Sequence, residues 1–205
     1  MTQALPKLIT FAEFLEWKPE VGRYELRNGV IFEMQPTGEH EEVKGFLASE
    51  LTVEFKPLNL PYFIPNQALV KPPEKESAYL PDVLILNRPN LASEALWKFS
   101  TVTQGATISL VIEVVSTNWR DDYLLKVAEY EEIGISEYWI VDSSALGGRR
   151  FIGNPKQPTI SVYQLVDDEY QISQFRGNNR IISSTFPELN LTASQIFQAG
   201  EIFRS

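Results

Sequence analysis

The chain has 205 residues, of which 43% are hydrophobic, with no cysteine, one histidine and a formal net charge of -9. This length and apolar content suit one buried core, so we predict a single domain over residues 1–205. The lack of cysteine excludes disulfides, zinc–thiolate sites and a cysteine nucleophile. A single histidine also excludes a multi-histidine metal site. Any metal must therefore be held mainly by oxygen ligands, which favours Mg²⁺ or Mn²⁺.

No segment approaches the roughly 20 apolar residues that are needed to cross a bilayer. Residues 1–7 lack the apolar centre of a signal peptide. We therefore expect a soluble, cytoplasmic protein with no membrane partner. The acidic balance disfavours binding to nucleic acid, because affinity for phosphate comes largely from Lys and Arg. A divalent cation held among the acidic side chains would reverse the charge locally.

The first half of the chain alternates helices with short strands. A capping box from Thr10 to Glu13 predicts a short helix that ends at Pro19. Asn28-Gly29 is the preferred pair for a type I′ turn, so it predicts a β-hairpin. The remaining elements expected here are the hairpin strands at 24–27 and 30–34, an amphipathic helix from 40 to 55, short strands at 62–64 and 67–70, and an exposed loop at 71–79.

The second half contains the expected centre of the sheet. Residues 108–115 are nearly all apolar and β-branched, which predicts a strand buried on both faces. A helix capped by Asp121 or Asp122 follows, and then a strand at 137–141. This order predicts a right-handed crossover between parallel neighbours. The other elements expected are a strand at 79–86, a loop at 143–158, a late hairpin of 160–165 and 170–173, and a helix at 192–197. The fold class predicted is α/β.

Two acidic residues enter apolar strands. Glu113 interrupts the run at 108–115, and a carboxylate inside a buried strand is costly unless a partner compensates it. Asp82 precedes the apolar residues 83–86 of another strand. Two such acids suit a shared cation, whereas a paired Arg or Lys is the alternative explanation for Glu113.

Three further residues are candidates for the same site. Lys126 lies on the crossover helix, which packs back on the sheet and can return its lysine to the strand ends; a solvated surface lysine is the alternative. Tyr130 follows one turn later and is expected to pack in the core. Glu25 precedes the hairpin turn and His40 opens the second helix. An exposed strand residue and a surface histidine are the ordinary explanations for these two.

The motifs also occur in a distinctive order. They are Tyr24-Glu-Leu-Arg-Asn-Gly29, Glu39-His40, Leu80-Pro-Asp82, Val111-Ile-Glu-Val-Val-Ser116, Asp122 with Lys126 and Tyr130, and Glu137-Tyr-Trp-Ile-Val-Asp142. This set, which covers nearly the whole chain, resembles the Uma-type family of restriction-endonuclease-like proteins in the PD-(D/E)XK nuclease superfamily. The resemblance implies a mixed central sheet flanked by helices, with N-terminal and C-terminal β-hairpins.

The resemblance also implies roles for the candidate residues. Pro81-Asp82 matches the PD element and Glu113 matches the second acid. Val115 stands where the superfamily normally has its lysine. The family resemblance suggests that the lysine has moved to the following helix as Lys126. Glu25 matches an extra acid from an N-terminal element, and His40 matches a family position near the site.

The activity that the resemblance implies is Mg²⁺- or Mn²⁺-dependent hydrolysis of DNA. Asp82, Glu113 and the carbonyl of Val114 would hold the ion, which would polarise a phosphodiester and lower the pKa of a bound water. Lys126 would orient that water or stabilise the charge on the phosphorane. The products would be a 5′-phosphate and a 3′-hydroxyl, and a homodimer is expected because superfamily nucleases often pair.

Two other functions stay open from the sequence. Val115 and the acidic charge favour a catalytically inactive binding or regulatory module that keeps the nuclease fold. A hydrolase of small phosphate esters would also suit an acidic surface, although no nucleotide motif supports it.

Overall fold

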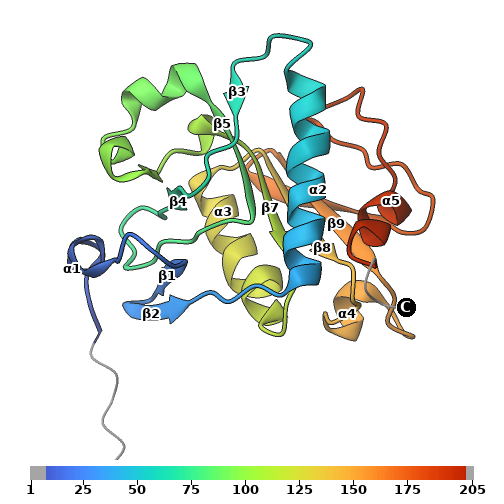
Figure 1. The fold of residues 1–205 in the computed structure, drawn as a ribbon, viewed down its shortest axis with the longest axis horizontal. Coiled ribbons are helices and arrows are strands. Elements are labelled where there is room, and N and C mark those ends of the chain that lie inside the picture. The colour runs from blue at the N-terminus through green and yellow to red at the C-terminus, as the bar shows by residue number, and fades with distance from the viewer. Residues whose placement is uncertain (1–7, 202–205) are drawn as a thin grey trace, which may run out of the picture.

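The computed structural model describes residues 8–201 (Figure 1). In chain order the elements are α1 Phe11–Trp17, β1 Tyr24–Arg27, β2 Val30–Glu33, α2 Gly38–Phe55, β3 Tyr62–Phe63, β4 Leu69–Val70, β5 Val83–Asn87, η1 Arg88–Ser93, η2 Trp97–Phe99, β6 Thr101–Val102, η3 Gly105–Thr107, β7 Ile108–Val114, η4 Asp121–Lys126, α3 Val127–Ile133, β8 Glu137–Asp142, α4 Arg149–Ile152, β9 Thr159–Val166, β10 Glu169–Phe175 and α5 Ala193–Ala199. Here η marks 3₁₀ helices, except η4, which is a π-helix.

A six-stranded sheet in the order β10-β9-β8-β7-β5-β3 forms the centre of the molecule. β7 and β8 are parallel, and the chain crosses between them through η4 and α3. The other neighbours in this sheet are antiparallel, so the sheet is mixed. The predicted architecture is confirmed: helices flank a mixed sheet, and a β-hairpin lies near each end of the chain.

Apolar residues cover both faces of the sheet, as expected for a strand such as β7 that is buried throughout. On one face, α2 and α5 pack against alternate residues of β5, β7, β8 and β9. On the other face, η4, α3 and α4 pack against the intervening residues. Figure 1 shows α2 and α5 side by side in front of the strands and α3 behind them. This alternation places Glu113, between Val111 and Val115, on the α3 face.

The N-terminal hairpin forms a separate two-stranded sheet, β1 with β2, beside the large one. Its turn has positive φ angles of 48° at Asn28 and 79° at Gly29, as a type I′ turn requires. Leu26 is fully buried and exchanges backbone hydrogen bonds with Ala78. This anchor fixes β1 next to the segment that leads to Asp82.

Several boundaries differ from those expected. The helix expected to open at His40 begins at Gly38, because the Thr37 side chain caps it. The strand expected from residue 79 begins only at Val83, so Asp82 immediately precedes it. Neither Asp121 nor Asp122 caps a helix, since both lie within the wider π-helical turn.

Two further expectations concerned the loop at 143–158 and segments that could cross a membrane. The loop expected at 143–158 contains the short helix α4. Within residues 8–201, no helix is long and apolar enough to cross a membrane.

Candidate active site

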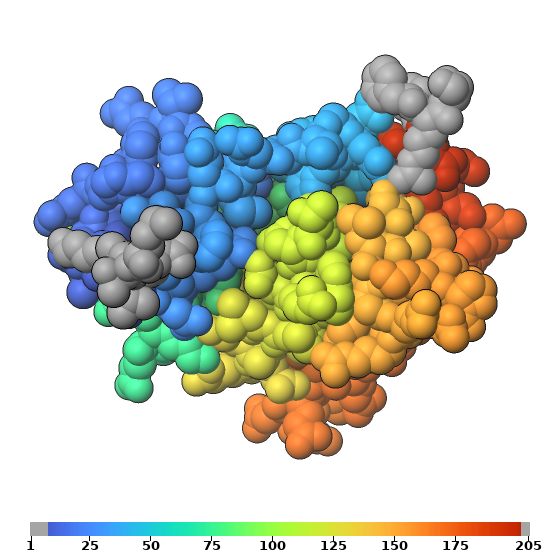
Figure 2. Space-filling view, turned by 90° about the horizontal axis from the view of Figure 1, so that it is seen from below, coloured from blue at the N-terminus to red at the C-terminus, as the bar shows by residue number. Residues whose placement is uncertain are grey.

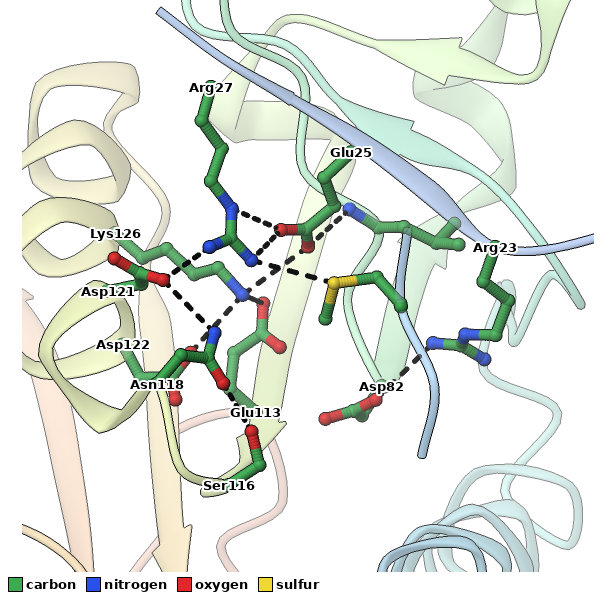
Figure 3. Close-up of polar contacts among 12 residues, drawn as sticks. Arg23, Glu25, Arg27, Asp82, Glu113, Ser116, Asn118, Asp121, Asp122 and Lys126 are labelled. Carbon is green, nitrogen blue, oxygen red and sulfur yellow. Dashed lines mark hydrogen bonds and ion pairs between the residues drawn. The ribbon is translucent and has the colours of Figure 1, made fainter. Parts of the chain in front are cut away.

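Lys126 forms the centre of a buried polar cluster. Its side chain is 1% exposed, and its Nζ lies 3.0 Å from Glu113 Oε1, 3.2 Å from Asp122 Oδ1 and 3.4 Å from Glu25 Oε1. Figure 3 shows the lysine extending from its helix toward Glu113 on β7. One ammonium group therefore forms ion pairs with three carboxylates. The alternative explanation, a solvated surface lysine, is wrong.

The crossover helix supplies two more groups to this cluster. Asp122 precedes Lys126 by four residues in the π-helix and contacts it on the same side. Tyr130 follows by four residues and its hydroxyl donates to Glu113 Oε1 at 3.1 Å. Tyr130 thus packs in the core as expected and also supports the acid. π-helical turns often occur at functional sites, where they reposition side chains.

Glu25 is fully buried, so the explanation as an exposed strand residue is wrong. Its Oε2 accepts from Arg27 Nε at 2.9 Å and Arg27 Nη2 at 2.6 Å, while its Oε1 accepts from the Leu80 amide at 3.1 Å. Arg27 also reaches Asp121 through Nη1. The N-terminal hairpin is therefore tied by charge to η4.

Asp82 lies one position beyond the Val83↔Ile112 pair of β5 and β7, so the same register places it opposite Glu113. Its Oδ2 accepts from the Val114 amide at 2.9 Å and lies 3.0 Å from His40 Nε2. Its Oδ1 accepts from Arg23 Nη2 at 3.3 Å. Burial alone would raise the pKa of Asp82, but His40 and the Val114 amide hold it below its usual value. Asp82 is therefore held as a carboxylate.

Negative groups outnumber positive ones across this region. The carboxylates are Glu25, Asp82, Glu113, Asp121 and Asp122, and the cationic partners are Arg23, Arg27, Lys126 and, when protonated, His40. Even with His40 counted as charged, five acids face four cations among residues 8–201. The cluster, in which Asp121 is partly exposed, therefore has one more acid than cations when every group is ionised.

The pKa values of the cluster reflect this excess. Burial and the neighbouring acids raise the pKa of Glu113 well above its usual value, although Lys126 opposes the rise. Burial likewise raises the pKa of Asp122 to about 6. Burial alone would lower the pKa of Lys126, but Glu113, Glu25 and Asp122 raise it. Lys126 therefore stays charged at neutral pH.

A cleft of about 630 Å³ reaches this region from the surface. The residues that line this cleft include Arg23, Arg27, His40, Asp82, Val114 and Asn118. Figure 2 looks onto the side of the molecule where the blue N-terminal segment, the yellow-green turn after β7 and the light-orange segment after β8 meet. Glu113 and Lys126 do not line the cleft but lie buried next to its Asp82–Val114 wall.

The donor set fits a hard divalent cation in its chemistry, since it consists of carboxylate and carbonyl oxygens. Val114 turns its N–H toward Asp82, and the N–H and C=O of one strand residue point to the same side, so its carbonyl is available there too. Within residues 8–201, no three His, Asp or Glu side chains gather as a metal site by themselves. Asp82 and Glu113 would thus need the Val114 carbonyl and water as further ligands.

The sequence-predicted residues gather in one place. Asp82, Glu113, Lys126, Glu25 and His40 all lie in or beside the cluster, and their catalytic and metal-binding roles stay predictions. Val115 packs in the apolar core on the α3 face and also lines the cleft, so it offers no charged group to the acids. The superfamily's usual lysine position is thus filled by a core residue.

Sequence reasoning missed Arg23, Arg27 and the role of Asp122. The two arginines flank Glu25 along the chain, but nothing in the spacing shows that a hairpin strand brings them to acids about 60 to 100 residues away. The pairing of Asp122 with Lys126 could have been predicted, because an acid four residues before a lysine on a helix can pair with it.

Comparison with known proteins bears on this arrangement. The model of the Uma2 family, described as "Putative restriction endonuclease", matches residues 11–194. The chain belongs to the Uma2 family. This membership confirms the resemblance and places the chain among restriction-endonuclease-like nucleases. The match spans every residue of the cluster, from Arg23 to Tyr130.

Among solved structures, the chain is similar to the crystal structure of a "putative nuclease belonging to DUF820" from Anabaena variabilis. The TM-score is 0.67 with 18% sequence identity, and the match covers 94% of this chain and 99% of that chain. At this identity the likeness shows the fold. No curated protein matches the sequence.

Proposed function

We propose that this Uma2-family protein is a divalent-cation-dependent endonuclease that hydrolyses phosphodiester bonds of DNA in the cleft beside Asp82 and Glu113. The observation that carries the proposal is the concentration of acids, five against four cations, in and directly behind the wall of an open cleft. Uncompensated buried charge is costly, so it persists where a ligand supplies the missing opposite charge. An Mg²⁺ or Mn²⁺ ion is the ligand that fits oxygen donors.

The residues that would hold this ion are the Asp82 and Glu113 carboxylates and the Val114 carbonyl. The chemistry that such a cation supplies when bound is polarisation of the phosphodiester and a lowered pKa of water. His40 and the Val114 amide fix Asp82 Oδ2, whereas Oδ1 has only the 3.3 Å contact to Arg23 within the described part of the chain. His40 is thus a positioning residue for the acid.

Lys126 acts in this proposal as a fixed positive charge rather than as a general base. Its neighbouring acids raise its pKa, so it does not release a proton at neutral pH. Its charge, held 3.0 Å from Glu113 behind the cleft wall, would offset the negative charge that gathers at the site during attack without contacting the phosphate. Glu25 and Asp122 hold the lysine in this position from two sides.

Arg23 is the group best placed to meet a substrate phosphate. It lines the cleft, its Nη2 makes one long contact with Asp82, and its buried Nε has no hydrogen-bond partner among residues 8–201. A guanidinium binds phosphate through paired N–H donors, so a phosphate in the cleft would satisfy the donors that the protein leaves free.

A second candidate function is a DNA-binding module without activity. It is favoured by the contacts of Asp82, because both of its oxygens already accept hydrogen bonds from the protein. In that case a phosphate would bind at Arg23 and no bond would be cut.

Plasmid cleavage tests the proposal. Wild-type protein, Asp82→Asn and Glu129→Gln are incubated with supercoiled DNA and Mg²⁺ or Mn²⁺. Glu129 is the matched control, because it is a buried acid that pairs with Lys75 outside the cleft. We expect nicked or linear product from wild type and Glu129→Gln, blocked by EDTA, and none from Asp82→Asn.

Equal cleavage by wild type and Asp82→Asn would overturn the site assignment. Binding of DNA without cleavage in either metal would favour the inactive module instead. The binding arm uses fluorescence anisotropy of a labelled duplex, with Ca²⁺ in place of Mg²⁺.

A further inference from the structure

We propose that the β10 edge of the sheet pairs with β10 of a second copy of this chain, which joins two central sheets into one continuous antiparallel sheet. The inference rests on the strand edge alone and is independent of the nuclease proposal. In Figure 2 the darker-orange hairpin of β9 and β10 projects from the lower margin of the molecule, clear of the cleft.

The two edges of the six-stranded sheet are built differently. β3 is two residues long, Pro61 and Pro65 flank it, and the Arg88 guanidinium lies 4.3 Å from the Phe63 ring centroid. Short length and proline are the ordinary protections of an edge strand against pairing. The β3 edge is therefore closed to another strand.

β10 has none of these protections. It spans seven residues, pairs with β9 without a register shift, and contains no charge or proline from Tyr170 to Phe175. The four residues 171–174 are exposed, and Ile172 at the centre of the strand is 57% exposed. A long, regular, uncharged edge is a template for pairing with another strand.

The hairpin turn determines which backbone groups face outward. Asp167 and Asp168 have positive φ angles of 51° and 65°, so β9 and β10 are joined by a two-residue type I′ turn. Val166 and Glu169 then exchange hydrogen bonds across the turn, and every second residue of β10 does the same. The outward residues are therefore Tyr170, Ile172 and Gln174. In agreement, the Tyr170 amide donates to Glu131 Oε1 at 2.6 Å rather than to β9.

Only one two-fold register uses all three outward residues. It places Ile172 opposite Ile172 of the second copy and Tyr170 opposite Gln174 of the second copy. The backbone groups of Ile172 and Gln174 face outward and would hydrogen-bond to the second copy. The Tyr170 amide would have to exchange its present acceptor, the Glu131 carboxylate, for a carbonyl of the second copy. The two exposed isoleucines would pack on each other at the dyad.

Charges at the ends of the strand favour a second copy over another partner. Continuing the same register places Asp168 opposite Arg176 of the second copy, and the symmetry repeats this pair at the other end. The Arg176 guanidinium donates through Nη2 to Gln174 Oε1 at 3.0 Å and through Nε to Thr159 Oγ1 of β9 at 2.8 Å, so pairing with Asp168 would exchange neutral partners for a carboxylate. The centre of β10 is uncharged and its two ends carry opposite charges. Two copies of this acidic chain can therefore meet along β10 without like-charge repulsion.

The contact is small. Seven residues on each copy compare with roughly 20–30 residues a side in a standard stable interface. We therefore expect a reversible dimer that dissociates on dilution rather than an obligate one.

Sedimentation velocity over a concentration series tests the inference. We expect wild type to dimerise, and Ile172→Lys to raise the dissociation constant at least about tenfold, because the lysine would bury an unpaired charge at the dyad. The matched control is Val53→Lys on α2, which replaces a similarly exposed apolar residue, 63% exposed, away from the edge.

A charge swap tests the register. Asp168→Arg alone and Arg176→Asp alone should each weaken the dimer severalfold, and the double variant should restore it. Circular dichroism of each variant confirms that the fold is kept. A wild type that stays monomeric at all concentrations would overturn the inference, as would a dimer that Ile172→Lys leaves unchanged. A double variant no tighter than the single ones would overturn the Ile172-centred register.

Discussion

Replacing Lys126 by methionine removes the shared partner of three buried carboxylates. Methionine keeps the length of the side chain, so the change is mainly in charge. The lysine lies 3.0 to 3.4 Å from Glu113, Asp122 and Glu25, and it is 1% exposed. Breaking a buried ion pair from one side costs about 3–5 kcal/mol of stability, which is a large part of the ~5–15 kcal/mol of a typical domain.

The loss should depend on pH. Without Lys126 the acids can regain neutrality only by taking up protons, so the destabilisation should be largest near pH 8 and smaller near pH 5.5. The added change Glu113→Gln should recover part of the loss, because one of the uncompensated carboxylates is gone. Urea unfolding followed by circular dichroism, in EDTA, measures each free energy.

The matched control is Lys44→Met, because Lys44 pairs only with the exposed Glu41 on the surface of α2 among the pairs of residues 8–201. Exposed pairs contribute only about 0–1 kcal/mol. If Lys126→Met lost no more stability than Lys44→Met near pH 8, Lys126 would not be the compensating charge. A loss of equal size at both pH values would refute the role of proton uptake.

Three further predictions concern neighbouring groups. Asp122 has a pKa raised from 3.8 to about 6, so it favours the folded state below pH 4 and loses this contribution as pH rises through 6; Asp122→Asn should remove up to about 3 kcal/mol of that pH dependence in urea unfolding. Arg23→Gln should tighten Mn²⁺ binding measured by calorimetry yet weaken binding of labelled DNA in Ca²⁺, and the exposed Arg88→Gln should change neither much; two effects of the same sign would contradict the Arg23 assignment. His40→Gln keeps a donor for Asp82 and should retain more cleavage than His40→Ala, whereas equal losses would argue against positioning.

Much of the fold followed from local rules. Asn28-Gly29 specified its hairpin turn, the apolar run around Glu113 specified a strand buried on both faces, and the short strand–helix–strand order specified the parallel pair of β7 and β8. Each of these depends on neighbours in the chain, which is why a single sequence suffices. Element ends were less predictable, because a cap such as Thr37 competes with nearby polar residues.

The site was predictable from the sequence where a charged residue stands among apolar ones. Glu113 and Asp82 stood out as acids next to apolar strands, and a buried carboxylate demands a partner. Arg23 and Arg27 gave no such signal, because arginine is common in a hairpin that is expected to be exposed. Their importance arises only when tertiary packing brings the hairpin to Asp82 and Asp121. The π-helical turn also has no sequence signature that propensity alone reveals.

Calorimetric titration with Mn²⁺ tests the central claim most directly, because it measures the metal site without relying on the right DNA substrate. We predict that wild type and the control Glu129→Gln bind the ion, and that Asp82→Asn and Glu113→Gln each bind at least about tenfold more weakly. Unchanged binding in both acid variants, or no binding by wild type, would contradict a metal site built on Asp82 and Glu113.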